Sequence, residues 1–544
     1  MKKILILIIA AFTFYSCSDF LEENPVAELT PDQITVKENL EGLVISAYAV
    51  LNGQFDEASN AYNSPTSNWS FGDVCSDDAY KGGGGTGDQN QIHLMEIFKT
   101  TPAIKDFERK WLALYEGVKR ANMAIRNLKK TDEYEESLKD QRIAEMRFLR
   151  GFFYFELKKI YNRIPYVDES AEDIDDYYKS NTELSSDELW GKIEDDLNAA
   201  YNVLPMTQAQ PGRATKMAAK ALLAKAYIFQ EKWSMASSAA DEVINSGLYQ
   251  LEPNFSDLYL PENDNGTEII FSVQNSVNDG SPNNYNGDIG DRLNPPGGPY
   301  PQYGFHRPTQ NLVNAFKTDE NGLPVNDNVN VNENDNVDPR LDYTVARPGI
   351  PFLDMGIYQA EWARDLATYG PFSPKKRIVS LNNPLQTKQW PYVSALNTYI
   401  IRYADVLLWK AEAAIESGDL ETGREYINMI RKRAAESETV KNTSGEDAAN
   451  YEIGQYDNFA NYQEAIEALR LERRLEFAHE GHRFFDLVRW DIAAEVMNEY
   501  FEVEKTRRTH LTGASFTKGV HEYSPIPQSQ IDLGRGLIQQ NPGY

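Results

Sequence analysis

The sequence predicts a mostly α-helical fold, a tetratricopeptide-like repeat scaffold interrupted by a long loop-rich, partly β insertion. Small and large apolar residues alternate at helical spacing in residues 216–247 and again in 403–433, which is typical of tetratricopeptide helix pairs. Between them, residues 252–397 are rich in Asn, Gly, Pro and aromatic residues and show no helical periodicity. Because one repeat cannot bury both of its faces, we expect further helix pairs to stack on these two.

The N-terminal part of the scaffold, residues 28–250, contains the other helices. Pro31 at the start of a run of apolar residues at helical spacing predicts a first helix that extends to Leu51. Helical spacing returns at three places further along the chain, namely residues 107–125, 143–160 and 189–204. The intervening residues 52–102 lack periodicity, and loops of this length are functional or disordered. Trp69 within the loop argues against disorder.

The insertion contains one segment with the pattern of a strand, residues 267–274 (TEIIFSVQ). The rest is too aromatic for a linker. We therefore expect loops that lie on the helical scaffold and contribute only short strands.

The C-terminal helical part, residues 398–544, includes a helix with apolar stripes on two nearly opposite faces, at residues 466–478. Charged side chains such as Glu472, Arg473 and Arg474 lie between the stripes. Burying charges costs several kcal/mol per ion unless each finds a partner, so we expect an internal lattice of Arg and Glu. Gly481 provides a left-handed residue that ends the helix.

Charge and leader sequence bear on location and partners. The chain carries a net charge of -28, and residues 1–16 hold two lysines and no acid, so their removal leaves -30. Such a chain is repelled by nucleic acid and by anionic lipid. Lys2 and Lys3 precede the apolar run 4–14, which is too short to span a bilayer and has the form of an export signal. Cys17 follows directly, where a lipidated cysteine is expected.

Four stretches together resemble the SusD/RagB family of Bacteroidetes outer-membrane lipoproteins. They are the lipoprotein-like start at Cys17 followed by SDFLEENP, the run IRYADVLLWKAEA at residues 401–413, the signature ERRLEFAHEGHRFFDLVRW at 472–490, and the ending YSPIPQSQIDL...QQNPGY. The resemblance covers the whole chain and implies one SusD-like domain at residues 17–544, after a signal peptide at 1–16. It also implies a protein that is not an enzyme and is attached to the outer membrane by lipid at Cys17, facing the extracellular side.

The resemblance further implies a function, which is capture of an oligosaccharide or polysaccharide for import through a SusC-like TonB-dependent transporter. In the family, glycans are held by loops of the N-terminal part and of the insertion. A sugar ring has an apolar C–H face, so a binding site needs a flat aromatic ring and groups that hydrogen-bond hydroxyls. The predicted glycan-binding residues are Trp69, Asp73, Asp77, Asp78 and Tyr80 in the first loop, and Tyr358, Trp362 and Arg364 in the insertion.

Other motifs do not indicate a metal or a cofactor. His479 and His482 are three residues apart, whereas the zinc motif HExxH needs histidines four apart on one helix face. The glycine run 82–87 follows no apolar strand and lacks the Lys and Ser/Thr of a P-loop. Residues 326–338 are rich in oxygen ligands for calcium but lack the glycine and final glutamate of an EF-hand. We therefore predict neither metal nor cofactor.

Two alternatives stay open. The repeats would also suit a scaffold that binds protein or peptide and has no sugar site. A hydrolase is the third reading, because 82 acidic residues furnish many carboxylate pairs, although the chain has no GxSxG motif. Binding of oligosaccharide by the purified protein separates the first reading from the second, and release of reducing ends would identify the third.

Overall fold

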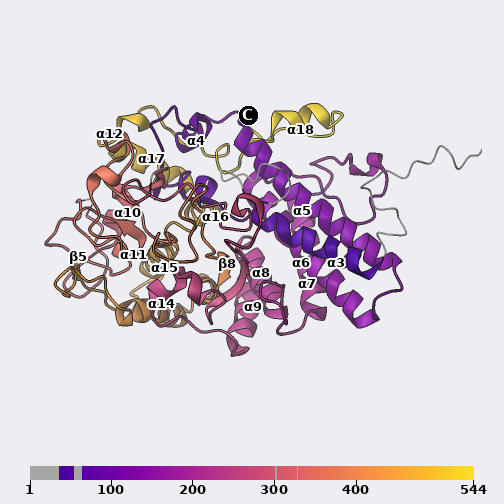
Figure 1. Ribbon diagram of the computed structural model, residues 1–544, viewed down its shortest axis with the longest axis horizontal. Coiled ribbons are helices and arrows are strands. Elements are labelled where there is room, and N and C mark those ends of the chain that lie inside the picture. The colour runs from indigo at the N-terminus through magenta and orange to yellow at the C-terminus, as the bar shows by residue number, and fades with distance from the viewer. Residues whose placement is uncertain (1–35, 54–63, 301–302, 328) are drawn as a thin grey trace, which may run out of the picture.

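The computed structural model describes residues 36–53, 64–300, 303–327 and 329–544. Helices dominate this part of the chain, and the strands within it form small sheets of two or three strands. Figure 1 shows the N-terminal helices gathered at one end of the molecule, with the insertion and the helices α14 and α15 at the other. None of the described helices combines the length and the apolar character that crossing a membrane requires. Cys17 and the leader lie outside the described residues.

The predicted N-terminal helices form and pack side by side. They are α3 (Lys37–Ala49), α5 (Lys105–Lys130), α6 (Glu136–Tyr161) and α7 (Ser186–Val203). One face of α5, including Phe107, Trp111 and Leu114, is buried in the main core. A Cβ added to Gly117 would lie 2.4 Å from the Phe153 ring, so this glycine permits the close approach of α5 and α6.

The two predicted repeats are helix pairs that stack on each other. The first consists of α8 (Lys216–Ile228) and α9 (Trp233–Asn245), and the second of α13 (Tyr403–Glu416) and α14 (Leu420–Glu436). Lys410 of α13 donates hydrogen bonds to Ser237 and Asp241 of α9, at 2.8 and 2.7 Å. The expectation of a stacked repeat scaffold is therefore confirmed.

The insertion leaves the scaffold and returns to it at one place. Strand β2 (Ile269–Val273) pairs antiparallel with β8 (Thr398–Arg402), and Val273 lies opposite Thr398. The strand predicted at 267–274 is thus present. Between these strands the elements are short, as expected: η7 (Pro282–Asn284), β3 (Phe305–Pro308), α10 (Gln310–Ala315), β4 (Lys317–Thr318), β5 (Asn336–Val337), α11 (Leu341–Thr344), β6 (Val345–Ala346), η8 (Ala360–Trp362), α12 (Leu366–Tyr369) and β7 (Ser373–Pro374).

The described part of the first loop is folded into the body of the molecule. It contains the π-helix η3 (Trp69–Asp73), strand β1 (Ala79–Gly82) and helix α4 (Asn90–Glu96). Strand β1 pairs antiparallel with β3 of the insertion, with Tyr80 opposite Arg307. Two segments more than 200 residues apart in sequence are therefore joined.

After α14, the C-terminal part continues with β9 (Asn450–Tyr451), α15 (Tyr462–Phe477), α16 (Arg483–Arg489), α17 (Ala493–Glu504), η9 (Thr509–Leu511) and α18 (Gln528–Leu533). Helix α15 is buried on two sides, as its stripes predicted: Ile466 and Leu469 pack with α13 and α14, and Leu475 packs with α10 and α11. The helix ends at Phe477, earlier than the predicted stop. Both His479 and Gly481 then adopt positive φ, +63° and +80°, in the turn that follows.

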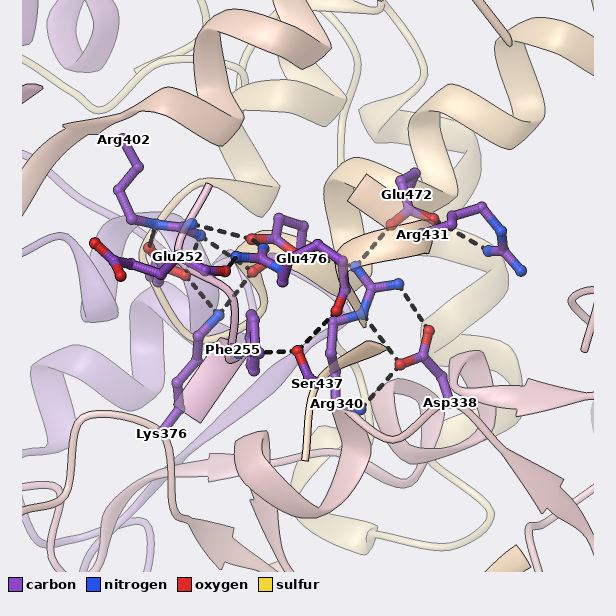
Figure 2. Close-up of polar contacts among 12 residues, drawn as sticks. Glu252, Phe255, Asp338, Arg340, Lys376, Arg402, Arg431, Ser437, Glu472 and Glu476 are labelled. Carbon is purple, nitrogen blue, oxygen red and sulfur yellow. Dashed lines mark hydrogen bonds and ion pairs between the residues drawn. The ribbon is translucent and has the colours of Figure 1, made fainter. Parts of the chain in front are cut away.

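The expected Arg/Glu lattice surrounds α15 (Figure 2). Glu476 accepts hydrogen bonds from Arg402 and Arg433 on Oε1, at 3.0 and 2.5 Å, and from Arg340 on Oε2, at 3.0 Å. Arg340 also binds Glu472, at 2.6 Å. Burial alone raises the pKa of Glu476, but the cations led by Arg433 and Arg402 outweigh this effect and hold it at about 2. The lattice fixes α15 between the insertion and the second repeat.

One detail of that expectation is wrong. Arg473 and Arg474 were expected to pair with glutamates, yet their partners are aspartates from other elements. Arg473 donates to Asp486 of α16 at 3.1 Å, and Arg474 donates to Asp78 of the first loop at 2.7 Å. The spacing of charges along a helix shows which side chains need partners, but it does not show which distant segment supplies them.

Candidate functional site

The aromatic and acidic residues predicted in the first loop are buried. Trp69 is 2% exposed and packs against Phe305 and His306 of β3, with ring centroids 6.1 and 5.8 Å apart. Tyr80 is also buried and donates its hydroxyl hydrogen bond to Glu504 of α17. These two rings therefore offer no face to a ligand, in contrast to the prediction, because the pairing of β1 with β3 draws them into the interior.

The three aspartates of this set are held by cations and backbone. Asp73 bonds to His306 Nε2 and accepts from the Gly481 amide, both at 2.9 Å. Asp77 pairs with Arg483 of α16 at 2.8 Å, and Arg474 pairs with both Asp77 and Asp78. All three carboxylates are buried. They extend the internal ion-pair network to the first loop and do not form the predicted sugar site.

The second predicted set stays at the surface in part. Tyr358 is buried and shares a 2.6 Å hydrogen bond with Ser373. Trp362 is half-buried, edge-to-face against Tyr358 with a centroid distance of 5.5 Å. The Arg364 side chain is 44% exposed, and its Nη1 donates to the Tyr303 carbonyl at 3.0 Å. Tyr358 is thus a support for Trp362, while Trp362 and Arg364 remain accessible.

The glycine-rich loop, residues 82–88, reaches the same place from the N-terminal part. Gly84 lies directly against Arg364, since an added Cβ would be 2.7 Å from its Nη2. Asp88 lies 3.4 Å from the same nitrogen and accepts from the Gly84 amide at 2.8 Å. The first loop and the insertion therefore meet at the surface through the glycine loop, whereas Trp69 contacts the insertion in the interior.

A buried lysine holds this loop in shape. Lys81 Nζ donates hydrogen bonds to the carbonyls of Gly82, Gly85 and Asp88, at 2.8, 2.9 and 2.5 Å. The amine lies over the rings of Phe305 and Tyr369, 5.3 and 5.5 Å from their centroids. Burial lowers the pKa of Lys81 to about 8, against the opposing effect of Glu96. The loop is fixed by a cation instead of by regular structure.

Trp390 is the most exposed tryptophan among the described residues, at 61%, and was not among the predicted glycan-binding residues. Tyr392, two residues later, packs against Tyr300 in the apolar cluster that also supports Trp362. The available signal was the sequence QWPY, a tryptophan next to proline in a segment without periodicity. We define the insertion surface as Arg364 with its neighbour Asp88, Trp362 two residues before Arg364, and Trp390, which is exposed on the segment whose Tyr392 packs in the same apolar cluster as Trp362.

The motifs considered for metals have other partners. The His479 ring stacks on His306 with a centroid distance of 4.1 Å, whereas His482 packs against Phe477 at 5.1 Å. In the Asn- and Asp-rich turn, Lys317 Nζ lies 2.9 Å from Asp327 and supplies the positive charge there. Among the described residues, no group of three or more His, Cys, Asp or Glu side chains is arranged to hold a metal ion.

Two family profiles match the chain over most of its length. Residues 267–544 match the profile described as SusD family, and residues 19–228 match the profile described as starch-binding associating with outer membrane. A SusD-like protein of Formosa agariphila is 22% identical over 580 residues, covering 100% of this chain and 99% of that one. The starch-binding protein SusD of Bacteroides thetaiotaomicron is 27% identical over 447 residues, covering 74% of this chain and 72% of that one.

The fold also matches solved structures. One is surface glycan-binding protein A from Bacteroides thetaiotaomicron in complex with laminarihexaose. It superposes with a TM-score of 0.69 at 23% identity, and the match covers 93% of this chain and 99% of that one. At this level of identity the match establishes the same architecture for both chains.

Proposed function

Because the chain belongs to the SusD family, we propose that it is a glycan-binding protein of the cell surface that passes an oligosaccharide to a TonB-dependent outer-membrane transporter. The names of its relatives support the ligand class, since they include a starch-binding protein and a protein solved with laminarihexaose. The description of the N-terminal profile, associating with outer membrane, supports the location. Those names describe binding and no catalysis, so we propose no enzymatic activity.

The observation that carries this proposal is the insertion surface. Trp390 presents an exposed indole on which the C–H face of a sugar can stack, and Trp362, on which Gly298 packs, is exposed in part. Arg364 and Asp88 provide a charged donor and a charged acceptor for hydroxyl groups next to Trp362. The apolar cluster beneath Trp362 and the Lys81 contacts beneath the glycine loop hold these groups before a ligand arrives.

Affinity measurements on tryptophan variants test the surface. The soluble chain lacking residues 1–17 is titrated calorimetrically with laminarihexaose and with maltohexaose. Loss of an aromatic anchor commonly costs about 2 kcal/mol or more, roughly thirtyfold in affinity, so we expect Trp390→Ala or Trp362→Ala to weaken binding by that factor. Trp233→Ala, at the start of α9 and outside the surface, is the matched control. Unchanged affinity in both surface variants would contradict the proposed location.

The same soluble chain also tests the remaining readings. We expect no release of reducing ends during prolonged incubation with the bound oligosaccharide. Release of product would identify a hydrolase. Binding of neither oligosaccharide, nor of any sugar on a glycan array, would favour the peptide-binding scaffold.

The proposed membrane attachment depends on Cys17. Acyl chains contribute about 0.8 kcal/mol per buried CH₂, so more than one chain gives durable anchoring. We expect Cys17→Ala to move the protein from the membrane fraction to the soluble fraction of cells. The same comparison is made in cells that lack the proposed TonB-dependent transporter. If the variant still stays entirely in the membrane fraction of those cells, lipid anchoring at Cys17 is contradicted.

A further inference from the structure

A second candidate site lies in the helical half, far in sequence from the insertion surface. A cavity of about 660 Å³ is lined by residues of α6, the start of α7, the turn between α8 and α9, and α16. Its lining shares no residue with the insertion surface. It includes aromatic rings, four cations (Lys158, Lys159, Lys232 and Arg489) and two carboxylates (Asp187 and Glu231).

This excess of cations runs against the composition of the chain, which has 54 Lys and Arg residues and 82 Asp and Glu residues. Both lining carboxylates, Asp187 and Glu231, are exposed. Water and salt therefore screen their charge more strongly than they screen the buried amines of Lys158 and Lys159. The cavity lining thus carries more cationic than acidic side chains, although the protein as a whole is acidic.

Lys158 differs from the other three cations in its partners. Lys159 pairs with Glu156 at 2.6 Å, Lys232 pairs with Glu194 at 2.6 Å, and Arg489 pairs with Glu412. Lys158 Nζ instead donates to two uncharged oxygens, Asn162 Oδ1 at 2.5 Å and Ser186 Oγ at 2.9 Å. No described carboxylate forms an ion pair with this amine; Nζ lies 6.0 Å from the centroid of the Trp190 ring, and Asp187 of the cavity lining is the carboxylate that attracts it.

A buried ammonium group without a counter-charge is costly. Lys158 is only 5% exposed, and burial lowers its pKa to about 8, so most molecules still carry the charge at neutral pH. An ammonium group has three donors, and the two uncharged oxygens use two of them. One charged N–H of Lys158 is therefore left over in a residue that lines an open cavity.

We propose that this cavity binds a small oxyanion, the carboxylate of a uronic acid or a sulfate group, with Lys158 as its counter-charge. Lys159, Lys232 and Arg489 are each paired with a carboxylate, so Lys158 is the cation on which binding mainly depends. Ser186, which accepts a hydrogen bond from Lys158, is the first residue of α7, and the first turn of this helix also contains the acids Asp187 and Glu188. The aromatic part of the lining would pack against the carbon skeleton that bears the oxyanion.

Calorimetric titration tests this proposal with sodium sulfate and with sodium glucuronate as probes, each against sodium chloride at equal ionic strength. We expect saturable binding by the wild-type chain. A hydrogen bond to a charged group contributes enough that Lys158→Met should weaken the affinity about tenfold or more. Lys105→Met, an exposed lysine at the start of α5, should bind like the wild type. A stronger response to sulfate identifies a sulfate group as the ligand, and a stronger response to glucuronate identifies a uronic acid.

Two results would overturn the proposal: no saturable binding of either probe by the wild type beyond chloride, or equal binding by a folded Lys158→Met variant. Near-ultraviolet circular dichroism reports the folding of each variant. Lys158→Arg keeps the charge and is expected to retain most of the affinity. Independently of any variant, wild-type crystals grown with selenate should show an anomalous peak beside Lys158 Nζ. Peaks confined to other surfaces would contradict the assignment.

Discussion

At the scale of single residues, the role of each tryptophan depends on contacts that its sequence neighbours do not reveal. Trp69 and Trp390 both lie in segments without periodicity and beside polar residues, yet Trp69 is 2% exposed and Trp390 is 61% exposed. The pairing of β1 with β3 buries Trp69. That pairing joins residues more than 200 positions apart, so no local pattern predicts it.

The two tryptophans should therefore respond differently to truncation. Trp69→Ala removes a fully packed ring and should lower the free energy of unfolding by about 3–5 kcal/mol. Trp390→Ala removes an exposed ring and should change it by about 0.5 kcal/mol or less. Urea denaturation measures both. A stable Trp69→Ala variant with impaired glycan binding would instead restore the first loop as a sugar site.

Arg340 shows what the lattice contributes. It binds Asp338, Glu472 and Glu476, and all four side chains are buried. Arg340→Leu leaves three carboxylates without this cation, and we expect a loss of about 3–5 kcal/mol in the free energy of unfolding. Arg535→Leu is the control, because Arg535 and its partner Asp175 are both exposed, and it should leave the denaturation midpoint almost unchanged. Equal effects of both substitutions would show that the lattice has no special role.

At the scale of elements, the sequence predicted helices well and loops poorly. The long helices of the scaffold were identified, because one buried face imposes a period of 3.6 residues along the chain, whereas α17, with its buried Ala493, Met497 and Phe501, was missed. Loops have no comparable periodicity from which their conformation can be predicted. Residues 82–88 take their shape from the Lys81 ammonium group, which contacts three carbonyls, and from a few further hydrogen bonds such as that from the Gly84 amide to Asp88.

Lys81→Met is the direct test of that loop. Methionine can pack between the rings of Phe305 and Tyr369 but donates no hydrogen bond, so the loop loses its three contacts while the apolar volume is kept. We expect amide hydrogens of residues 82–88 to exchange about tenfold faster or more. We also expect weaker glycan binding at the adjacent insertion surface. Lys105→Met is again the control. Unchanged exchange in this loop would mean that other contacts hold it.

At the scale of the whole molecule, buried titratable groups respond to pH in opposite directions. Burial opposes the ionisation of Glu480, but Arg402 and Lys376 outweigh it and lower its pKa to about 2. Burial raises the pKa of Asp264 to about 7. A carboxyl group whose pKa is lower in the folded state stabilises the fold at pH values above its pKa in the unfolded chain. This stabilisation is lost as the pH falls towards the pKa of the folded state. A raised pKa stabilises the fold at low pH and loses this effect as pH rises through 7.

Two variants separate these contributions. Glu480→Gln should be less stable than the wild type at pH 6, and the difference should shrink as the pH falls from about 4.5 towards 2. Asp264→Asn should gain stability relative to the wild type as the pH rises from about 4 to 7. Urea denaturation at several pH values measures each difference, in which the contributions of unchanged groups cancel. Parallel slopes for the two variants would contradict the assigned directions.

The antiparallel pairing of Val273 with Thr398 has a consequence for how such proteins diversify. Residues 274–397 leave and rejoin the scaffold at two facing residues, so the length and content of this segment can change while the distance that it must bridge stays fixed. Exchange of residues 274–397 between relatives is then a modular graft that leaves the repeats in place. The graft must include Asp338, Arg340 and Lys376, because these side chains dock this segment onto α15. Recombination at this junction could therefore alter the recognised glycan in a single step.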